Sequence, residues 1–412
     1  MRSATTPIKI IPTRILDPRQ TLAYNGHTLI NIAPVPRNLQ PIFPIGEHSV
    51  KQILCLSNEP WSSSPGRTQQ LISRLRDAQI LYFCPPSGRT DKAWKENGRK
   101  VRPNVTVYTL PPLFFGVGEQ LPHLFRAEHR RQSTFVREKA IRHRFHSPLL
   151  WVTAPEHVHM LDDLSYDGLV YDCDREWDDV PPHWEGSLAH AADIVFTASP
   201  LLSERLAPCS PNIALLPNGV NFPLFSGQNG VPGRGLLPQI SGPLFGWAGT
   251  ITSELDLSPI FTAATENPDW NFLLLGRRED NPMLSRLRRL PNVIFAGPCT
   301  LSEVPDWLFR CDVLVDLLRR DRLDDGVVST RLYEYLSTGK PVVSMLWPDQ
   351  VELFPDVVYG AYTDREFLSM CRSALEEDPG FVSQRRRDHG AAAAWSTRAS
   401  EVLRILSTAG LL

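Results

Sequence analysis

Residues 324–343 combine side chains that suit the binding of a diphosphate and a polyol. A polar turn leads into a predicted helix that begins at Ser329 or Thr330, and both residue types are good helix N-caps. The free N–H groups of a first helical turn attract anions, and Arg331 adds a forked guanidinium group suited to phosphate oxygens. Glu334, one turn later, is placed to accept hydrogen bonds from sugar hydroxyls. The alternative is an ordinary capped helix with an exposed arginine and glutamate.

The elements around this segment follow a regular pattern. From residue 50 onward, short β-branched or aromatic runs alternate with amphipathic segments of helical length, which is typical of βα units and a parallel sheet. The predicted strands are 52–57, 80–84, 104–110, 149–152, 169–173, 194–198, 213–216, 244–248, 271–275, 293–296, 313–317, 341–345 and 357–359. The predicted helices are 67–77, 119–143, 156–164, 184–191, 200–206, 256–266, 282–289, 302–310, 330–338, 364–377 and 394–408.

A stretch dense in glycine and proline divides this pattern into two halves of similar size. We therefore expect an α/β protein with two Rossmann-like parallel-sheet domains that face each other across a cleft. Ligands of such sheets bind outside the carboxyl ends of the strands. The predicted parts are an irregular extension (1–48), a first Rossmann-like domain (49–222), a linker (223–241), a second Rossmann-like domain (242–390) and a last helical segment (391–412).

One run of residues resembles a family signature. Arg331-Leu332-Tyr333-Glu334-Tyr335, followed by Gly339-Lys340-Pro341-Val342-Val343, is similar to the donor-binding signature of GT-B glycosyltransferases. The likeness is to family 4 in particular, and to its bacterial cell-surface polysaccharide branch. The resemblance implies the GT-B fold, with Ser329, Thr330, Arg331 and Glu334 binding a nucleotide sugar. It also implies that residues 49–222 are the acceptor-binding domain, that residues 242–390 are the nucleotide-sugar-binding domain, and that 391–412 form a closing helix that returns to the first domain.

Other stretches resemble the same family in the same order. They are 170–174 (VYDCD), 192–199 (ADIVFTAS), 216–221 (LPNGVN), 246–250 (GWAGT) and 395–398 (WSTR). The resemblance makes Gly249 and Thr250 part of a glycine-rich loop that lets the backbone approach a diphosphate. Together these stretches span the chain from about residue 50 to residue 408, and their collinearity carries more weight than any one of them.

The sequence departs from the family pattern at two places. Gly326 stands where the family has a second acidic residue that binds the transferred sugar, and Asp325 and Asp324 are the nearest substitutes. The loop after Thr250 lacks the cation pair that grips the diphosphate in many members. Arg331 and Arg319 are the favoured replacements, and Arg277 is a further candidate, although each arginine except Arg331 is more often a solvated surface charge.

Pro298 and Cys299 occupy the place where related enzymes bind the base through backbone groups. That kind of contact does not separate UDP, GDP and TDP, and we expect a UDP-sugar.

Four residues after strands of the first half are candidates for the acceptor side: Asp172, Asp174, Glu156 and His157. If the reaction inverts the anomeric centre, one of them takes the proton of the acceptor hydroxyl as general base. If it retains configuration, the front-face mechanism that the resemblance implies needs no such base. The alternatives are a buried Asp172 that ties loops together and a His157 that only forms hydrogen bonds at a helix start.

The composition excludes several other classes. The chain has 412 residues and a formal net charge of −2, which gives no support to nucleic acid as a partner. Its seven cysteines form no C-x-x-C pair, and we expect neither disulfides, nor a metal site, nor any cofactor besides the nucleotide-sugar substrate. No apolar run approaches the ~20 residues that span a bilayer, and the N-terminus lacks a signal-peptide pattern. We expect a cytoplasmic protein.

One predicted helix is strongly basic. Residues 125–146 hold seven lysines and arginines against two glutamates. This asymmetry predicts either peripheral contact with the inner face of a membrane or with a lipid-phosphate acceptor, or a solvated helix with internal ion pairs. Phe125, Phe135, Ile141 and Phe145 form either its buried side or a membrane-facing stripe.

The sequence as a whole predicts a metal-independent glycosyltransferase of the hexosyltransferase type. It would move a sugar from a nucleotide diphosphate sugar to a hydroxyl acceptor, which is a sugar or glycan, a lipid-linked molecule or a small natural-product intermediate. Arg331 would stabilise the departing diphosphate. Two alternatives stay open: a weak or inactive homologue that acts as a partner or scaffold, and a nucleotide-sugar epimerase. A dinucleotide oxidoreductase is disfavoured because Ser57-Asn58-Glu59-Pro60, and no G-x-G-x-x-G, follows the first strand.

Overall fold

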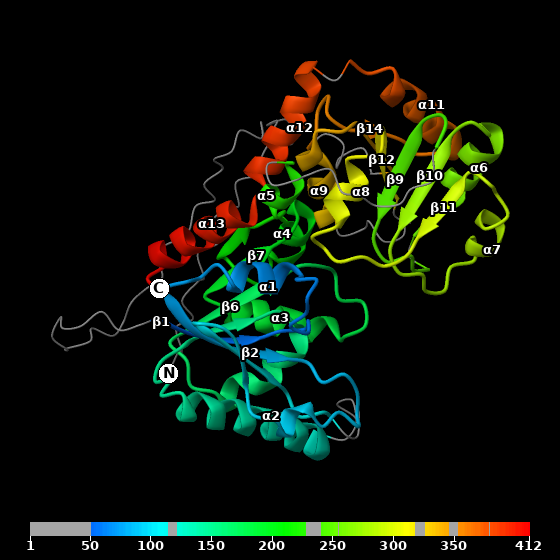
Figure 1. Ribbon diagram of the computed structural model, residues 1–412. Coiled ribbons are helices and arrows are strands. Elements are labelled where there is room, and N and C mark those ends of the chain that lie inside the picture. The colour runs from blue at the N-terminus through cyan, green and yellow to red at the C-terminus, as the bar shows by residue number, and fades with distance from the viewer. Residues whose placement is uncertain are drawn as a thin grey trace, which may run out of the picture. The chain divides into compact units, whose positions relative to one another are not determined.

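The computed structural model of the protein describes residues 51–113, 122–227, 240–253, 255–317, 326–345, 353–378 and 380–412. Within these residues the chain forms two sheets, each covered by helices (Figure 1). The predicted extension over residues 1–48 and most of the predicted linker lie outside the described residues. The predicted domain boundaries therefore stay predictions.

The first sheet has the strand order β3-β4-β2-β1-β5-β6-β7-β8. Its strands are β1 (Lys51–Leu56), β2 (Ala78–Cys84), β3 (Arg99–Arg102), β4 (Val105–Thr109), β5 (Leu149–Val152), β6 (Gly168–Cys173), β7 (Ile194–Thr197) and β8 (Ile213–Leu215). All pairings are parallel except that of β3 with β4. The direction in which successive strands are added reverses between β1 and β5, which makes this the topological switch point.

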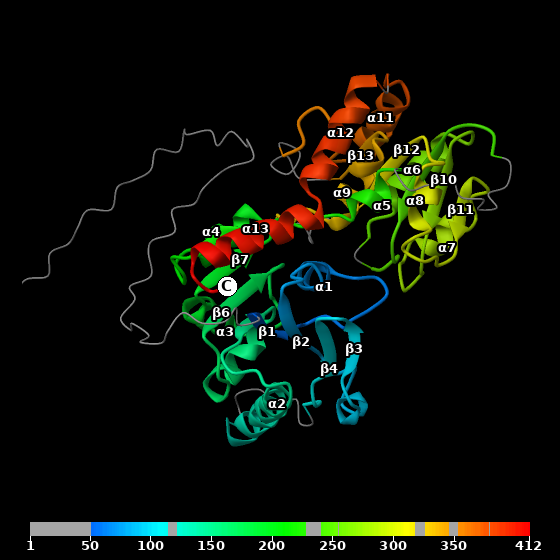
Figure 2. The ribbon, with the colours of Figure 1, turned by 60° about the vertical axis from the view of Figure 1, so that its left-hand side comes forward.

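Both faces of this sheet are buried, because its strands are near-continuous apolar runs. In β1, Ile53 and Cys55 face one core cluster and Leu54 and Leu56 face another. The first cluster is covered by α1 (Arg67–Ile72) and by the last helix, α13 (Trp395–Thr408) (Figures 1 and 2). The second is covered by α2 (Pro122–Arg142), the 3-10 helix η2 (Pro155–Asp163), α3 (Pro182–Ala191) and α4 (Pro200–Leu206). This part is therefore a three-layer α/β/α arrangement.

The second sheet has the order β11-β10-β9-β12-β13-β14, and all its pairings are parallel. Its strands are β9 (Leu244–Ala248), β10 (Asn271–Leu275), β11 (Val293–Ala296), β12 (Val313–Asp316), β13 (Val342–Ser344) and β14 (Tyr359–Gly360). This is the order of a dinucleotide-binding Rossmann sheet, with the switch point between β9 and β12.

Helices also cover both faces of the second sheet. The helices here are α5 (Phe222–Phe225), α6 (Ser258–Glu266), α7 (Leu284–Leu287), α8 (Val304–Leu308), α9 (Thr330–Thr338), α11 (Asp364–Leu375) and α12 (Gly380–Ala392). Residues of α6, α7 and α11 pack on one face, and residues of α5, α8 and α9 pack on the other. Helix α12 lies beside α9 (Figure 2). The prediction of two parallel-sheet Rossmann-like parts is confirmed.

Four described elements were not predicted from the sequence: the short 3-10 turn Ala93–Lys95, β3, α5 and α12; in addition, the predicted helix 156–164 is the 3-10 helix η2. Strand β3 was not expected because three of its four residues are basic; a charged, antiparallel strand at a sheet edge needs no apolar pattern. Helix α12 was missed because its sequence, GFVSQRRRDHGAA, lacks an amphipathic pattern. Tertiary contacts stabilise it: Arg386 is fully buried, donates to the carbonyl oxygen of Val357 at 2.7 Å and pairs with Glu377.

The structure shows which predicted role the apolar side chains of the basic segment 125–146 have. Phe125, Phe135 and Phe145 are buried in the first domain's core, so they do not form a membrane-facing stripe, whereas Ile141 is 68% exposed. Most of the arginines remain on the exposed side. Among the described residues, no helix combines the length and the apolar character that crossing a membrane requires.

Candidate functional site

Helix α9 begins with the cap that the sequence predicts. Ser329 is the N-cap, and its Oγ accepts a hydrogen bond from the N–H of Leu332 at 3.2 Å. Thr330 and Arg331 are the first two helical residues. The helix ends at Gly339, whose φ of 77° is the left-handed conformation that favours glycine. Helix α9 is the next described element after β12, and the contact of Arg331 with Asp316, the last residue of β12, places the first turn of α9 at the carboxyl end of that strand.

Arg331 is held in place from two sides. Its Nη1 lies 3.3 Å from Oδ1 of Asp316, and its guanidinium carbon lies 4.7 Å from the centre of the Trp247 ring. The arginine side chain is still 21% exposed. Cation–π contacts of partly desolvated groups contribute roughly 0.5–2 kcal/mol. The structure thus presents a guanidinium group that is pre-positioned and retains access to solvent.

Asp316 is the partner that the sequence analysis missed. It is the last residue of β12 and its side chain is only 1% exposed. Burial raises the pKa of Asp316, and the adjacent Arg331 guanidinium opposes that shift. A carboxylate this deeply buried requires a paired cation. An acidic residue within the apolar run VLVDLL was the available sequence signal for this pair.

Gly249, in the predicted glycine-rich loop, lies beside Arg331. A Cβ atom at Gly249 would come within 3.0 Å of the Trp247 ring and 3.1 Å of Nη2 of Arg331. The loop after β10 requires a glycine as well. Gly276 has a φ of 132°, and a Cβ there would overlap the carbonyl oxygen of Gly249. The close approach of these two loop backbones and Arg331 occurs at the switch point, where Rossmann sheets bind ligands.

Tyr335 explains why α9 is positioned at this loop. Its hydroxyl group accepts a hydrogen bond from the N–H of Ala248, the last residue of β9, at 2.9 Å. The tyrosine is fully buried. Because Tyr335 is one turn after Arg331, this bond fixes the first turn of α9 against the end of β9. Tyr335 belongs to the run that resembles the family signature, but the sequence alone did not predict a role for it.

Glu334 is half-buried on the same helix. Burial raises the pKa of Glu334 to about 7, and the nearby Arg331 opposes this shift. Among the described residues, no hydrogen bond to its carboxyl group is found. The predicted role of Glu334 in binding hydroxyl groups stays a prediction.

The other predicted donor-binding residues lie at the same edge of the sheet. Thr250 follows β9, Arg277 follows β10, and Pro298 and Cys299 follow β11. Thr250, Arg277 and Pro298 are exposed, and Cys299 is half-buried. The structure does not bring Arg277 into an ion pair with another described residue. Arg319 and Asp325 lie outside the described residues, so their predicted roles stay predictions.

In the first domain, Asp172 forms a buried ion pair. Nε and Nη2 of Arg67 lie 3.0 and 2.8 Å from its Oδ1, and the two side chains are 4% and 1% exposed. Nη1 of Arg67 also donates to Oδ1 of Asn218 at 3.3 Å, and the amide of Asn218 donates to the carbonyl oxygen of Val328 at 3.0 Å. This geometry fits the loop-tying role, the alternative that the sequence left open for Asp172, better than a general base.

Asp174 lies near an acid that the sequence analysis did not select, Glu59. Burial raises the pKa of Glu59 to about 7, and so does the charge of Asp174, while Arg175 and Arg67 oppose the shift. Burial also raises the pKa of Asp174, with Arg175 opposing. Glu59 follows β1 and Asp174 follows β6, so both lie at the carboxyl edge of the first sheet. An acidic residue directly after the first strand was the missed signal.

His157 is placed in the core and not at the surface. It lies in η2 with 5% of its area exposed, and its N–H donates to the carbonyl oxygen of Ala154 at 3.2 Å. Burial, assisted by His129, lowers the pKa of His157 to about 3. A buried imidazole that stays neutral at physiological pH is a poor proton acceptor, and this geometry favours the helix-start alternative. Among the described residues, no group of three potential ligands could hold a metal ion.

The chain is similar to known proteins over most of its length. No protein-family model matches it. The chain is 25% identical over 333 residues to a Bacillus subtilis protein named "Putative teichuronic acid biosynthesis glycosyltransferase TuaH". The match covers 75% of this chain and 83% of that protein.

Two solved structures share the fold at low sequence identity. An Escherichia coli trehalose-6-phosphate structure bound with UDP-2-fluoro glucose has a TM-score of 0.65 at 10% identity, covering 86% of this chain and 99% of the other. An α,α-trehalose-phosphate synthase (UDP-forming) from Burkholderia xenovorans, in complex with glucose-6-phosphate, has a TM-score of 0.64 at 12% identity, covering 86% and 100%. The predicted GT-B fold is therefore confirmed, and the likeness to a named glycosyltransferase supports sugar transfer from a nucleotide sugar.

Proposed function

We propose that this protein transfers a sugar from a UDP-sugar to a hydroxyl acceptor, with the donor bound at the carboxyl edge of the second sheet. The observation that carries this proposal is the position of Arg331. Asp316 and Trp247 hold its guanidinium beside the Gly249 loop at the switch point of the sheet. A fixed, partly exposed cation next to a glycine loop and a helix N-terminus suits a diphosphate.

The chemistry requires charge stabilisation at the leaving group. The bond between the anomeric carbon and the diphosphate oxygen breaks, the acceptor oxygen bonds to that carbon, and the acceptor proton passes to an oxygen of the departing diphosphate and from there to water. Arg331 and the first turn of α9 would stabilise the negative charge that develops on the diphosphate, and Glu334 would bind donor hydroxyls. Because these groups supply the countercharge themselves, we propose that transfer needs no metal ion.

For the acceptor we propose a glycan or a lipid-linked intermediate, bound by the first domain. The name of the Bacillus subtilis relative supports a role in making a cell-surface polysaccharide, and we place the chain in family 4 as a proposal. A cytoplasmic location with peripheral membrane contact through residues 125–146 remains part of this proposal. The exposed arginines of α2 support it, whereas the buried phenylalanines of that helix do not contribute.

The donor site is tested with UDP and UDP-glucose binding to matched variants. Arg331→Lys keeps a charge for Asp316 but loses the fork and the stacking on Trp247, and Glu334→Ala removes the acceptor of hydroxyl bonds. We expect each variant to weaken binding or turnover by about tenfold or more, as the loss of a charged hydrogen bond implies. Arg365→Ala, an exposed arginine of α11, is the control and should bind as wild type. Wild-type affinity in both site variants would refute the assignment.

One observation favours the alternative that this protein is a glycosyltransferase homologue with little or no activity. Gly326 has a φ of 65°, and a Cβ there would come within 2.9 Å of Cδ1 of Leu201. The backbone conformation therefore favours glycine at the position where the family places its sugar-binding acid. Product analysis separates the cases: a transferase forms a glycoside, an epimerase converts the donor without an acceptor, and a scaffold protein does neither.

A further inference from the structure

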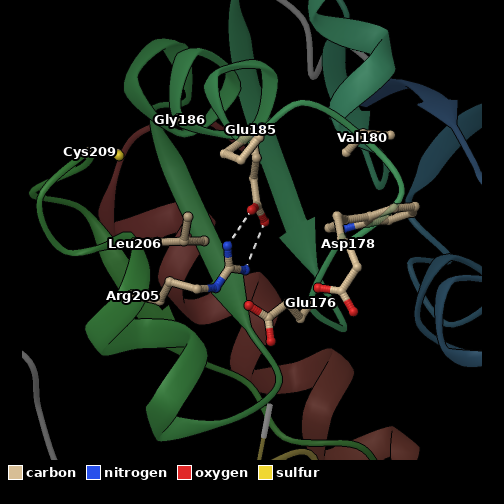
Figure 3. A pocket seen from close by; sticks show the side chains of 10 residues that line it. Glu176, Asp178, Val180, Glu185, Gly186, Arg205, Leu206 and Cys209 are labelled. Carbon is tan, nitrogen blue, oxygen red and sulfur yellow. Dashed lines mark hydrogen bonds and ion pairs between the residues drawn. The ribbon is translucent and has the colours of Figure 1, made fainter. Parts of the chain in front are cut away.

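A cavity of about 450 Å³ lies in the first domain beside the loop that follows β6. Its walls come from that loop and from helices α3 and α4 (Figure 3). This volume falls within the range of roughly 300–1,000 Å³ that is typical of small-ligand sites. Apolar groups of Leu206 and Val180 line it together with Trp177, and the carboxylates of Glu176, Asp178 and Glu185 are also part of the lining.

The cation in this cavity is already neutralised. Arg205 forms a bidentate pair with Glu185: Nη2 lies 3.0 Å from Oε1, and Nη1 contacts Oε2 (Figure 3). The exposed carboxylates of Glu176 and Asp178 have no ion pair with another described residue. The lining residues therefore leave an excess of negative charge and no spare guanidinium group.

Acidic side chains continue from the cavity to the carboxyl edge of the sheet. The pKa values of Glu59 and Glu156 are both raised, first by burial and then by the nearby carboxylates Asp174 and Asp179, respectively. The two arginines at this edge are engaged: Arg67 pairs with Asp172 at 2.8 Å, and Arg175 lies 3.6 Å from Asp174. Arg175 also lies 4.6 Å from the centre of the Trp177 ring, which links this edge to the cavity.

We propose that this cavity binds a sugar residue of the acceptor that carries hydroxyl groups but no negative charge, and that it discriminates against phosphorylated and carboxylated sugars. The inference rests on the proposed function, because it takes the first domain as the acceptor side. Carboxylates accept hydrogen bonds from hydroxyl groups, and the side chains of Trp177 and Leu206 offer apolar surface to the C–H groups of a sugar ring.

Rejection of anions follows from the same groups. A phosphate or carboxylate in the cavity would be close to Glu176 and Asp178 and would find no unpaired cation among the lining residues. Like-charge contact that is built into a site is an effective source of specificity. The Burkholderia xenovorans synthase was solved with glucose-6-phosphate, an anionic sugar. A sugar of that kind is one that the cavity described here would exclude.

The preference is measured by ligand-observed NMR on the full chain with UDP present. The neutral probes are the methyl glycosides of glucose, galactose and N-acetylglucosamine, and the anionic probes are glucose 6-phosphate and glucuronic acid. We expect at least one neutral probe to bind about tenfold or more tightly than both anions at low salt, with a smaller gap at high salt. Equal or tighter binding of an anionic probe, or no binding of any neutral probe, would overturn the inference.

Two sets of variants locate the effect. Glu176→Gln combined with Asp178→Asn should reduce the gap between neutral and anionic probes by about threefold or more, whereas Glu138→Gln, exposed on α2, should leave it unchanged. Gly186→Leu would direct a side chain towards Cys209 and occupy part of the cavity, so neutral binding should weaken by about threefold or more. Gly186→Ala is its control, since the new Cβ meets only the Cys209 sulfur at an ordinary 3.5 Å. Unchanged neutral binding in Gly186→Leu would refute the location.

The donor site provides an independent readout. The thermal shift caused by UDP should be the same in these cavity variants as in the wild type. If UDP causes no shift in any protein, the proposed function fails. If UDP binds normally and the anionic probes still bind as tightly as the neutral ones, only the present inference fails.

Discussion

At the scale of single residues, the candidate donor site depends on a few buried or half-buried charges. Arg331 contacts both Asp316 and Trp247, and these contacts fix its direction before any ligand arrives. Pre-positioned charge costs no reorganisation when a diphosphate binds or departs. Glu334 is different, because its carboxyl group has no partner among the described residues and burial shifts its pKa.

The raised pKa of Glu334 predicts a pH-dependent difference in stability. The folded value is about 7 against an ordinary 4.5, so between these pH values the unfolded chain has lost a proton that the folded chain keeps. Stability contributed by protonated Glu334 is present below pH 4.5 and is lost as the pH rises through about 7. The Glu334→Gln variant has no carboxyl group to ionise at this position, so it does not lose this stability.

The melting temperature of Glu334→Gln, measured relative to wild type, should therefore increase by about 2 °C or more across that interval and then stay constant. Differential scanning fluorimetry over a pH series checks it. Glu366→Gln, an exposed glutamate of α11, is the control and should show no such trend. A difference that is flat with pH would contradict the assigned shift.

At the scale of elements, the site depends on how closely two loops of the second sheet approach each other. The loop after β9 and the loop after β10 meet at Gly249 and Gly276: a Cβ at Gly276 would overlap the carbonyl oxygen of Gly249, and a Cβ at Gly249 would lie tightly against Trp247 and Arg331. Tyr335 then ties α9 to the end of β9. The backbone geometry of these strand ends, more than any one side chain, sets the distance between the loop and Arg331.

Gly276→Ala should therefore disturb the donor site. Its φ of 132° is unfavourable for alanine, and the new methyl group would overlap the carbonyl oxygen of Gly249. We expect a loss of stability of about 1–3 kcal/mol and weaker UDP binding. Gly297→Ala, after the neighbouring strand β11, is a matched control because a Cβ there has no atom within 4 Å. Urea denaturation and UDP titration measure the stability and the UDP affinity of both variants. If Gly276→Ala behaves as Gly297→Ala does, the loop tolerates the displacement and the prediction is wrong.

At the scale of the whole molecule, a series of polar contacts connects the first sheet to the start of α9. Asp172 pairs with Arg67, Arg67 donates to Asn218, and Asn218 donates to the carbonyl oxygen of Val328, next to the cap of α9. The backbone oxygen of Asn218 also accepts from Nε of Arg398 at 3.3 Å. These bonds join residues that are more than a hundred positions apart in the sequence.

Removal of one partner of the buried pair should be costly. Arg67→Met leaves the Asp172 carboxylate buried without its cation, and such changes typically destabilise a protein by about 3–5 kcal/mol. The double variant Arg67→Met with Asp172→Leu removes both charges and should recover most of that loss. Urea denaturation measures both variants. A double variant that is as unstable as the single one would show that the ion pair itself, and not the orphaned charge, is what matters.

Much of the fold could be predicted because parallel strands buried on both faces leave a clear sequence pattern. The predicted strands 149–152, 244–248, 271–275 and 293–296 coincide with β5, β9, β10 and β11. Helix α12 could not be predicted, because a fully buried Arg386 is explained only by its contacts with Val357 and Glu377. The Ser329 cap was predictable since capping depends on neighbouring residues alone.

The sequence by itself determined the alternation of strands and helices and the capped start of α9, and it made Arg331 and Glu334 candidates for binding residues. These features depend on local periodicity and on residue types a few positions apart. Tertiary structure alone decided that Asp316 and Trp247 hold Arg331, that Arg67 occupies Asp172, and that His157 is buried in the core. Those outcomes depend on which distant residues share a desolvated space, and the energy of a buried charge is set by its neighbours and not by its place in the sequence.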